Sequence, residues 1–154
     1  KLLKPFNCNI LVNDIVNFKD FYQENNATPV RIEELLKNSD IVTLHLPLNN
    51  TTENILSKER LKMLKDDSIL INLARGGLVD ERSLKKMLLE KKIAGAALDV
   101  FAIEPPTDTE FALMDNVLVT PHIGGSTEEA ILAMGMAAID GLDNAKDPLA
   151  FLTK

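Results

Sequence analysis

His122 stands where an apolar strand pattern meets a glycine pair, and its imidazole is suited to proton transfer. It follows Pro121 and the apolar run 117–119, and it precedes Gly124 and Gly125, after which a Ser/Thr pair opens a long helical pattern. Backbone N–H groups at a helix N-terminus favour an anionic ligand, and an imidazole changes its charge near neutral pH. The pattern predicts either an acid–base site beside an anionic ligand or a histidine with a structural role only.

Two further charged side chains follow predicted strands and could complete such a site. Arg75 ends the sequence INLAR at residues 71–75, and ligands bind at the carboxyl ends of parallel strands, where a guanidinium offers a fork of donors to a carboxylate. Glu104 lies in an irregular segment, and a carboxylate bonded to an imidazole holds its tautomer and supports its charged form. Sequence distance leaves the contact between Glu104 and His122 open, and a surface Arg after a strand is common.

Two aspartates end predicted strands where a dinucleotide could bind. Asp14 follows the strand at 9–13 and precedes the neutral Ile15. A carboxylate at this place accepts hydrogen bonds from ribose hydroxyls and repels the extra phosphate of NADP. Asp99 ends the strand at 94–99 and could bind an amide of the cofactor. Each could equally be a simple turn residue.

The remaining candidate residues are interpreted as mainly structural. His45 is predicted to be mainly structural, with Pro47 shaping the exit of its strand. Cys8 is the only cysteine, which excludes an internal disulfide and a cysteine-based metal site, and it is expected to be a small buried apolar residue. We predict no metal site. The methionines are expected to fill the core, at positions Met63, Met87, Met114, Met134 and Met136.

The elements that must position these residues alternate between short Ile/Val-rich runs and helical patterns. This alternation predicts βαβ units and a parallel sheet buried on both faces. The predicted strands are residues 9–13, 41–46, 68–72, 94–99 and 117–120, and the predicted helices are 32–38, 57–64, 80–90 and 127–144. Ser57 and Asp80 are expected to be N-caps. Residues 100–113 form an irregular excursion, of a length that favours a functional loop.

Composition limits the class of protein and its partners. The chain has 154 residues, of which 45% are hydrophobic and 26% charged, as in one soluble α/β domain. A net charge of −6 without a Lys/Arg block argues against nucleic acid as a partner. No apolar run approaches the roughly 20 residues of a membrane span, and the first residues do not resemble a signal peptide. We expect a soluble, cytoplasmic protein without a membrane partner.

With these motifs in order, the sequence resembles the D-isomer-specific 2-hydroxyacid dehydrogenases over nearly its whole length. The stretch at 120–127 is most similar to the phosphoglycerate dehydrogenases of that family. The motifs that carry the resemblance are VND at 12–14, LHLPL at 44–48, INLARGGLVD at 71–80, AALDVF at 96–101, EP at 104–105 and TPHIGGST at 120–127.

The resemblance implies a catalytic trio of Arg75, Glu104 and His122. His122 would protonate the carbonyl oxygen of a 2-keto acid, Glu104 would support the imidazolium, and Arg75 would bind the substrate carboxylate and polarise the carbonyl. The cofactor would be NAD, with Asp14 as its ribose ligand and Asp99 at the nicotinamide carboxamide. The remaining residues implied to line the cofactor cleft are Leu46, Pro47, Leu73, Ala74, Arg75, His122, Gly124 and Gly125, with Thr52 a weaker candidate.

The sequence departs from the family in lacking the Gly-x-Gly-x-x-Gly turn that binds the pyrophosphate. The strand before that turn and the separate substrate domain are also missing, and residues 1–4 look like the end of a helix that Pro5 stops. The missing strand would be central, so we expect a Rossmann-like doubly wound parallel sheet that is incomplete and split. Residues 1–145 are expected to be a partial NAD-binding domain, and 146–154 a C-terminal tail, of a longer enzyme.

The predicted function is that of an NAD-dependent oxidoreductase, which transfers a hydride between NAD(H) and a D-2-hydroxy acid/2-keto acid pair. Phosphoglycerate-type substrates come first and glycerate or hydroxypyruvate second, and the full-length enzyme is expected to be a homodimer. The alternative is an NAD-sensing corepressor of the same fold, which binds partner peptides without turnover. A third possibility is an inactive folded piece.

Overall fold

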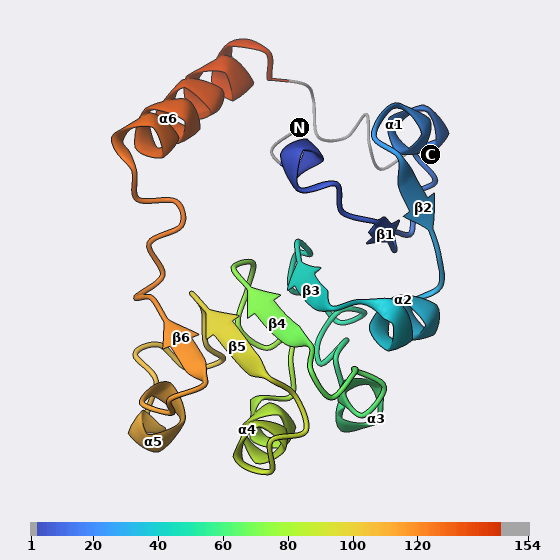
Figure 1. Cartoon of the computed structure of the whole chain (residues 1–154). Coiled ribbons are helices and arrows are strands. Elements are labelled where there is room, and N and C mark those ends of the chain that lie inside the picture. Colours follow the sequence, from blue (N-terminus) through green and yellow to red (C-terminus); the bar gives the residue numbers. More distant parts are fainter. Residues whose placement is uncertain (1–2, 146–154) are drawn as a thin grey trace. The chain divides into compact units, whose positions relative to one another are not determined.

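The structure is a computed structural model of the chain and describes residues 3–145 (Figure 1). The predicted tail at 146–154 lies outside the described residues. The chain divides into two compact units, Lys1–Pro121 and His122–Lys154. The described helix of the second unit is α6 (Glu128–Asp143). The elements of the first unit are η1 (Lys4–Phe6), β1 (Ile10–Val12), α1 (Lys19–Glu24), β2 (Ala27–Pro29), α2 (Ile32–Asn38), β3 (Ile41–Leu44), α3 (Lys58–Leu61), β4 (Ile69–Asn72), α4 (Glu81–Leu89), β5 (Gly95–Leu98), α5 (Thr109–Ala112) and β6 (Val117–Val119).

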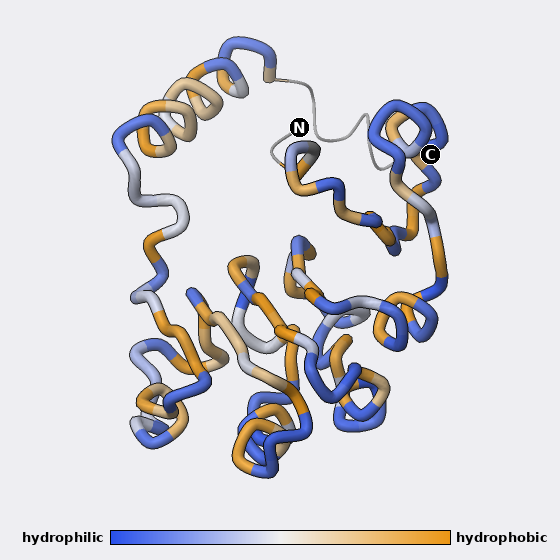
Figure 2. The backbone as a smooth tube through the Cα atoms, in the orientation of Figure 1, coloured by the Kyte–Doolittle hydropathy of each residue, from blue (hydrophilic) through white to orange (hydrophobic). Residues whose placement is uncertain are grey.

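A parallel sheet of four strands, in the order β3-β4-β5-β6, carries most of the candidate site. In its register Val42 lies beside Leu70, and Leu70 beside Ala96. All five predicted strands are present, and each is one or two residues shorter at its ends than the apolar pattern suggested. The predicted α/β, Rossmann-like parallel architecture is therefore confirmed. Figure 2 shows these strands as apolar segments, with hydrophilic residues gathered in the loops and on the helices.

Within the described residues of the first unit, 3–121, only one face of this sheet is covered. Its strand order advances by one strand at each step, and because parallel crossovers are right-handed, the connecting helices fall on the same side. Val42 and Leu70 point to that side and share one core with Leu84 of α4. A fully buried Leu stabilises the fold by about 1.5–3 kcal/mol. On the opposite face Ile41 is 59% and Leu118 67% exposed, so the expected burial of both faces is wrong here.

Side-chain caps set the start of two helices, as predicted. The Ser57 hydroxyl accepts the Arg60 N–H at the start of α3, and the Asp80 carboxylate accepts the Ser83 N–H at 3.0 Å at the start of α4. Each cap satisfies an N–H that has no partner inside the helix. The Asp80 cap also determines that Glu81 is the first residue of α4.

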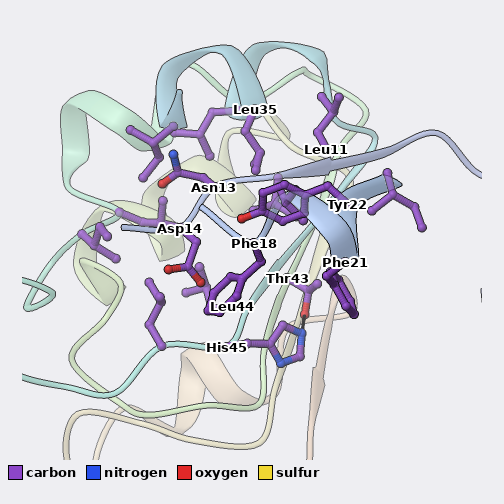
Figure 3. A pocket seen from close by; sticks show the side chains of 18 residues that line it. Leu11, Asn13, Asp14, Phe18, Phe21, Tyr22, Leu35, Thr43, Leu44 and His45 are labelled. Atoms are coloured by element: carbon purple, nitrogen blue, oxygen red, sulfur yellow. Dashed lines mark hydrogen bonds between the residues drawn. The ribbon is translucent and has the colours of Figure 1, made fainter. Parts of the chain in front are cut away.

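The sheet is split into two parts, as predicted. β1 and β2 form a separate two-stranded parallel sheet, and among residues 3–145 no strand pairs with the second edge of either β1 or β3. A largely apolar cavity of about 550 Å³ lies between them (Figure 3). Its walls come from β1, α1, α2 and β3, with Leu11, Tyr22, Leu35 and Leu44 among the lining residues.

Three short elements were not predicted from the sequence. They are α1, β2 and α5, the last of which falls inside the segment expected to be irregular. Helix α5 has a single four-residue turn, begins at the N-cap Asp108 and buries only Phe111. Elements this short show too few repeats for hydrophobic periodicity to reveal them.

Two expectations near the N-terminus are wrong. Cys8 is exposed rather than buried, because residues 5–9 all lie on the surface before β1. Pro5 does not stop a helix, since it lies inside the 3₁₀ turn η1, whose φ a proline can adopt. Residues 1 and 2 of the predicted helix end lie outside the described range.

Within the second unit, helix α6 leaves apolar residues exposed, including two methionines. Met63, Met87 and Met114 pack into or against the core as expected, whereas Met134 and Met136 are 58% and 57% exposed. The described residues of the second unit contain no other helix or strand against which α6 could pack. No helix in the described range combines the length and apolarity needed to span a membrane.

Residues 1–154 expressed alone should self-associate, because β1 and β3 each have one edge that no strand of residues 3–145 pairs with, beside exposed apolar side chains. Size-exclusion chromatography with light scattering should detect oligomers at micromolar concentration. The control is Thr43→Lys, which places a charge on exposed β3 and should reduce association. A monodisperse wild-type monomer would show that these edges do not drive pairing.

Candidate active site

A buried asparagine shapes the turn that presents Arg75. Asn72 ends β4 and is only 3% exposed. Its Nδ2 donates to the Arg75 carbonyl at 2.9 Å, and its Oδ1 accepts the Ala74 N–H at 3.1 Å. The Arg75 side chain is exposed and donates from Nη1 to the Ala74 carbonyl at 2.6 Å. Sequence reasoning missed Asn72, although an amide that ends an apolar run is a signal for such a turn.

The ends of β3 and β4 open onto one cavity of about 500 Å³. It is lined by His45, Leu46, Pro47, Leu48, Leu73, Ala74 and Arg75. The structure thus brings together the predicted cleft residues of two neighbouring strands, as parallel pairing requires. Their contact with a cofactor stays a prediction.

Thr52 and His45 make local contacts beside this cavity. The Thr52 hydroxyl donates to the Pro47 carbonyl at 2.6 Å and accepts the Asn49 N–H at 2.9 Å, so it holds the loop after β3. His45 Nε2 lies 3.1 Å from the Thr43 hydroxyl (Figure 3). The structural interpretation of His45 is compatible with this bond, and the role of Thr52 toward a cofactor is untested.

The loop after β5 binds two carboxylates through consecutive amides. The Phe101 N–H donates to Glu104 Oε1 at 3.0 Å, and the Ala102 N–H donates to Glu81 Oε1 at 2.7 Å. Phe101 is buried and packs edge-to-face on Phe111 with ring centres 6.0 Å apart. Half-burial raises the pKa of Glu81; the bond from the Ala102 N–H lowers it in part, and the Glu104 charge adds to the rise.

Gly76 brings the Arg75 turn into contact with this loop. A Cβ at Gly76 would lie 1.9 Å from the Phe101 carbonyl oxygen and 2.6 Å from the Ala102 nitrogen. No side chain fits there, so only glycine permits the approach. The residue before Gly76 is Arg75, and three residues after Phe101 comes Glu104. The structure therefore joins the turns that carry two members of the predicted trio.

The two aspartates occupy different surroundings. Asp99 follows β5, is 3% exposed and accepts a hydrogen bond from the Thr120 hydroxyl at the end of β6. Asp14 is exposed after β1, where its Oδ1 accepts the Val16 N–H at 2.9 Å, and it lines the cavity between β1 and β3 (Figure 3). Both therefore stand at the carboxyl ends of parallel strands, as predicted, and their contacts with a cofactor are untested.

His122 opens the second unit in a left-handed backbone conformation, with φ of 54°. Residues other than glycine seldom adopt this backbone conformation, and those that do are often found at functional sites. The Ser126 N–H then donates to the Ile123 carbonyl at 2.9 Å, and Thr127 caps α6 by accepting the Ala130 N–H. The predicted turn and helix N-terminus after His122 are present, and the pairing of His122 with Glu104 stays a prediction.

The donors present fit part of a dinucleotide. The exposed Asp14 carboxylate suits ribose hydroxyls, and the cavity at the ends of β3 and β4 is lined by apolar residues together with His45 and Arg75. The sequence supplies no glycine-rich turn for the pyrophosphate. Within residues 3–145 no three His, Cys, Asp or Glu side chains group as metal ligands would.

This fold is that of the dinucleotide-binding domain of 2-hydroxyacid dehydrogenases. The Aquifex aeolicus D-lactate dehydrogenase, solved in complex with NAD and lactic acid, matches with a TM-score of 0.80 and 30% identity, over 90% of this chain and 47% of its own. Residues 1–124 match the model of the D-isomer specific 2-hydroxyacid dehydrogenase, NAD binding domain, and the chain belongs to that family.

Two curated relatives show how much of a whole enzyme the chain represents. It is 44% identical over 136 residues to D-3-phosphoglycerate dehydrogenase of Methanocaldococcus jannaschii, matching 88% of this chain and 26% of that one. It is 41% identical over 114 residues to hydroxypyruvate reductase of Thermotoga maritima, matching 72% of this chain and 37% of that one. The chain thus spans less than two fifths of each relative's length.

Gly76→Ala should destabilise the protein by at least about 1–3 kcal/mol, because the added methyl would overlap the Phe101 carbonyl. Gly125→Ala is the matched control, since nothing lies within 4 Å of its added Cβ, and it should change stability by about 0.5 kcal/mol or less. Thermal and urea unfolding measure both. Equal stability of the two variants would mean that the Arg75 turn does not approach the Phe101 peptide this closely.

Proposed function

We propose that these residues are the cofactor-binding half of a longer NAD-dependent D-2-hydroxyacid dehydrogenase. The observation that carries the proposal is the contact of Gly76 with the Phe101 peptide, which joins the Arg75 turn to the Glu104 loop. Membership of the family supports it, and so does the retention of Arg75, Glu104 and His122 together. The whole protein would be a cytoplasmic homodimer that acts on small acids.

In the proposed reduction of a 2-keto acid, the three residues have different roles. Arg75 binds the substrate carboxylate with its exposed guanidinium and polarises the reacting carbonyl. His122 donates a proton to the carbonyl oxygen, and in the reverse direction it takes the proton from the hydroxyl. Glu104 accepts a hydrogen bond from the imidazole and stabilises its charged form. Bound NAD(H) supplies or accepts the two electrons together with the hydrogen at the substrate carbon.

The cofactor would lie along the carboxyl ends of the strands. Asp14 would accept bonds from the adenosine ribose, and Asp99 would contact the nicotinamide carboxamide. The walls of the cleft would be formed by Leu46, Pro47, Leu73, Ala74, Gly124 and Gly125, with a smaller contribution from Thr52. Arg75 and His122 would border the nicotinamide end, where the reaction takes place.

The substrate is proposed to be a phosphoglycerate-type acid, with hydroxypyruvate or glycerate as the second choice. The names of the relatives, a phosphoglycerate dehydrogenase and a hydroxypyruvate reductase, support these two in the same order. The test is turnover of a panel of 2-keto acids with NADH by the full-length protein. NADH binding without turnover of any acid would favour the corepressor function instead.

His122→Asn in the full-length enzyme should lower kcat by roughly 10²–10⁴ and leave NADH binding nearly intact. Asparagine tolerates the left-handed backbone that His122 adopts, so this variant removes the proton donor without a backbone penalty. Stopped-flow turnover and NADH fluorescence titration measure the two effects. His45→Asn is the control and should change kcat by only a few-fold; the reverse pattern would assign the proton transfer to His45.

NADH should be preferred over NADPH, because a 2′-phosphate beside Asp14 would meet like charge and neither Asn13 nor Ile15 supplies a cation. Asp14→Asn keeps an acceptor for the Val16 N–H and removes the charge, so it should narrow the preference. Steady-state kcat/KM for both cofactors decides this. A wild-type kcat/KM with NADPH at or above that with NADH would exclude Asp14 as the ribose ligand.

A further inference from the structure

Two connections of the sheet meet at one peptide group, that between Phe101 and Ala102. The connection from β4 to α4 contributes Gly76, and α4 contributes its first residue, Glu81. The connection from β5 to α5 contributes the peptide itself and Glu104. Gly76 packs against the Phe101 carbonyl, and Glu81 Oε1 accepts the Ala102 N–H at 2.7 Å. We propose that Glu81 is a positioning residue, which fixes the loop after β5 that carries Glu104 (the Glu104 loop) relative to the turn after β4 that carries Arg75 (the Arg75 turn). This inference rests on the proposed function.

The contacts at the start of α4 leave Glu81 available for this purpose. The helix cap is already supplied by Asp80, whose carboxylate accepts both the N–H and the hydroxyl of Ser83, at 3.0 and 2.8 Å. Glu81 therefore does not serve as the cap, and its carboxylate reaches a backbone amide 21 residues further along the chain. A bond to a carboxylate is stronger than one between neutral groups, so it suits a contact that must hold a loop.

The position is costly for a carboxylate, which argues for a specific role. Glu81 is half-buried, and both this burial and the nearby Glu104 charge raise its pKa. An exposed glutamate at the same point of α4 would avoid that cost. The two carboxylates bind neighbouring amides, Glu104 that of Phe101 and Glu81 that of Ala102. Releasing Ala102 would thus loosen the short turn on which the Glu104 side chain depends.

Loss of the Glu81 contact should affect proton transfer and leave substrate binding unchanged. Arg75 is held by Asn72, through bonds that do not involve Glu81. Loss of the Glu81 contact should therefore leave substrate carboxylate binding intact and disturb only the group that supports the proton donor. Because a displacement of about 1 Å at a reacting group can cost on the order of 10²-fold in rate, kcat should fall while KM stays nearly constant.

The experiment compares variants of Glu81 in the full-length enzyme. Glu81→Ala removes the acceptor and should lower kcat by roughly 10–100-fold, with KM for the keto acid and for NADH within about threefold of wild type. Glu81→Gln keeps an acceptor oxygen and should stay within a few-fold of wild-type kcat. Glu90→Ala, at the opposite end of α4, is the control and should have no effect on kcat, because the Glu90 carboxylate pairs with Lys86 and Lys92 at the surface.

Hydrogen exchange at the Ala102 amide gives a readout that does not depend on activity. Glu81→Ala should speed this exchange, and Glu81→Gln should preserve much of the protection. Should Glu81→Ala fail to fold, Glu81→Met fills similar volume without a carboxyl oxygen and takes its place. Wild-type kcat in the variant that lacks the acceptor, equal losses in that variant and in Glu81→Gln, or unchanged exchange at Ala102 would each overturn the proposal. An inactive wild-type enzyme would instead overturn the proposed function, while the exchange result would still decide whether Glu81 holds the loop.

Discussion

The parallel pairing of β4 with β5 is the constraint on which the described site depends. It brings the carboxyl ends of both strands to one edge of the sheet, so the turn after Asn72 and the loop after Leu98 leave side by side. A glycine at position 76 lets their backbones touch. Antiparallel pairing would send the two connections to opposite ends of the sheet, and Arg75 could not lie near the Glu104 loop.

Several polar groups at this edge are held by hydrogen bonds to the backbone, and Asp99 is bonded to a side chain. Asn72 shapes one turn, Glu81 and Glu104 bind the other, and Thr120 and Asp99 tie β6 to β5. A buried polar group must be hydrogen-bonded to be tolerated, and each such bond also fixes a loop that would otherwise move. Stability and positioning are thus obtained from the same contacts.

The split sheet leaves one face and two strand edges uncovered by the described elements of the first unit. The core beneath β3–β6 is closed by Leu-rich helices, whereas the opposite face and the facing edges of β1 and β3 carry exposed apolar side chains and backbone without strand partners among residues 3–145. The three residues proposed for catalysis lie in this chain, but the described elements form no surface that would close around a substrate and a pyrophosphate. The described contacts can therefore position the turns that carry Arg75 and Glu104, although they do not enclose a ligand there.

The sequence determined the element types, the parallel α/β class, the caps at Ser57 and Asp80 and the candidate residues, because hydrophobic period, capping chemistry and ordered motifs are local signals. It could not reveal Gly76 or Glu81 as parts of the site, since their roles depend on a partner far away in sequence. Asn72 bonds to Ala74 and Arg75 close by, so its local signal was present in the sequence and was missed. Short elements such as α5, and the exposure of Cys8 and Met134, also escaped it, because burial depends on which surfaces meet. Only the tertiary structure decided that Glu81 would bind Ala102, since that contact exists only after β4 and β5 have paired and α4 has packed beneath them.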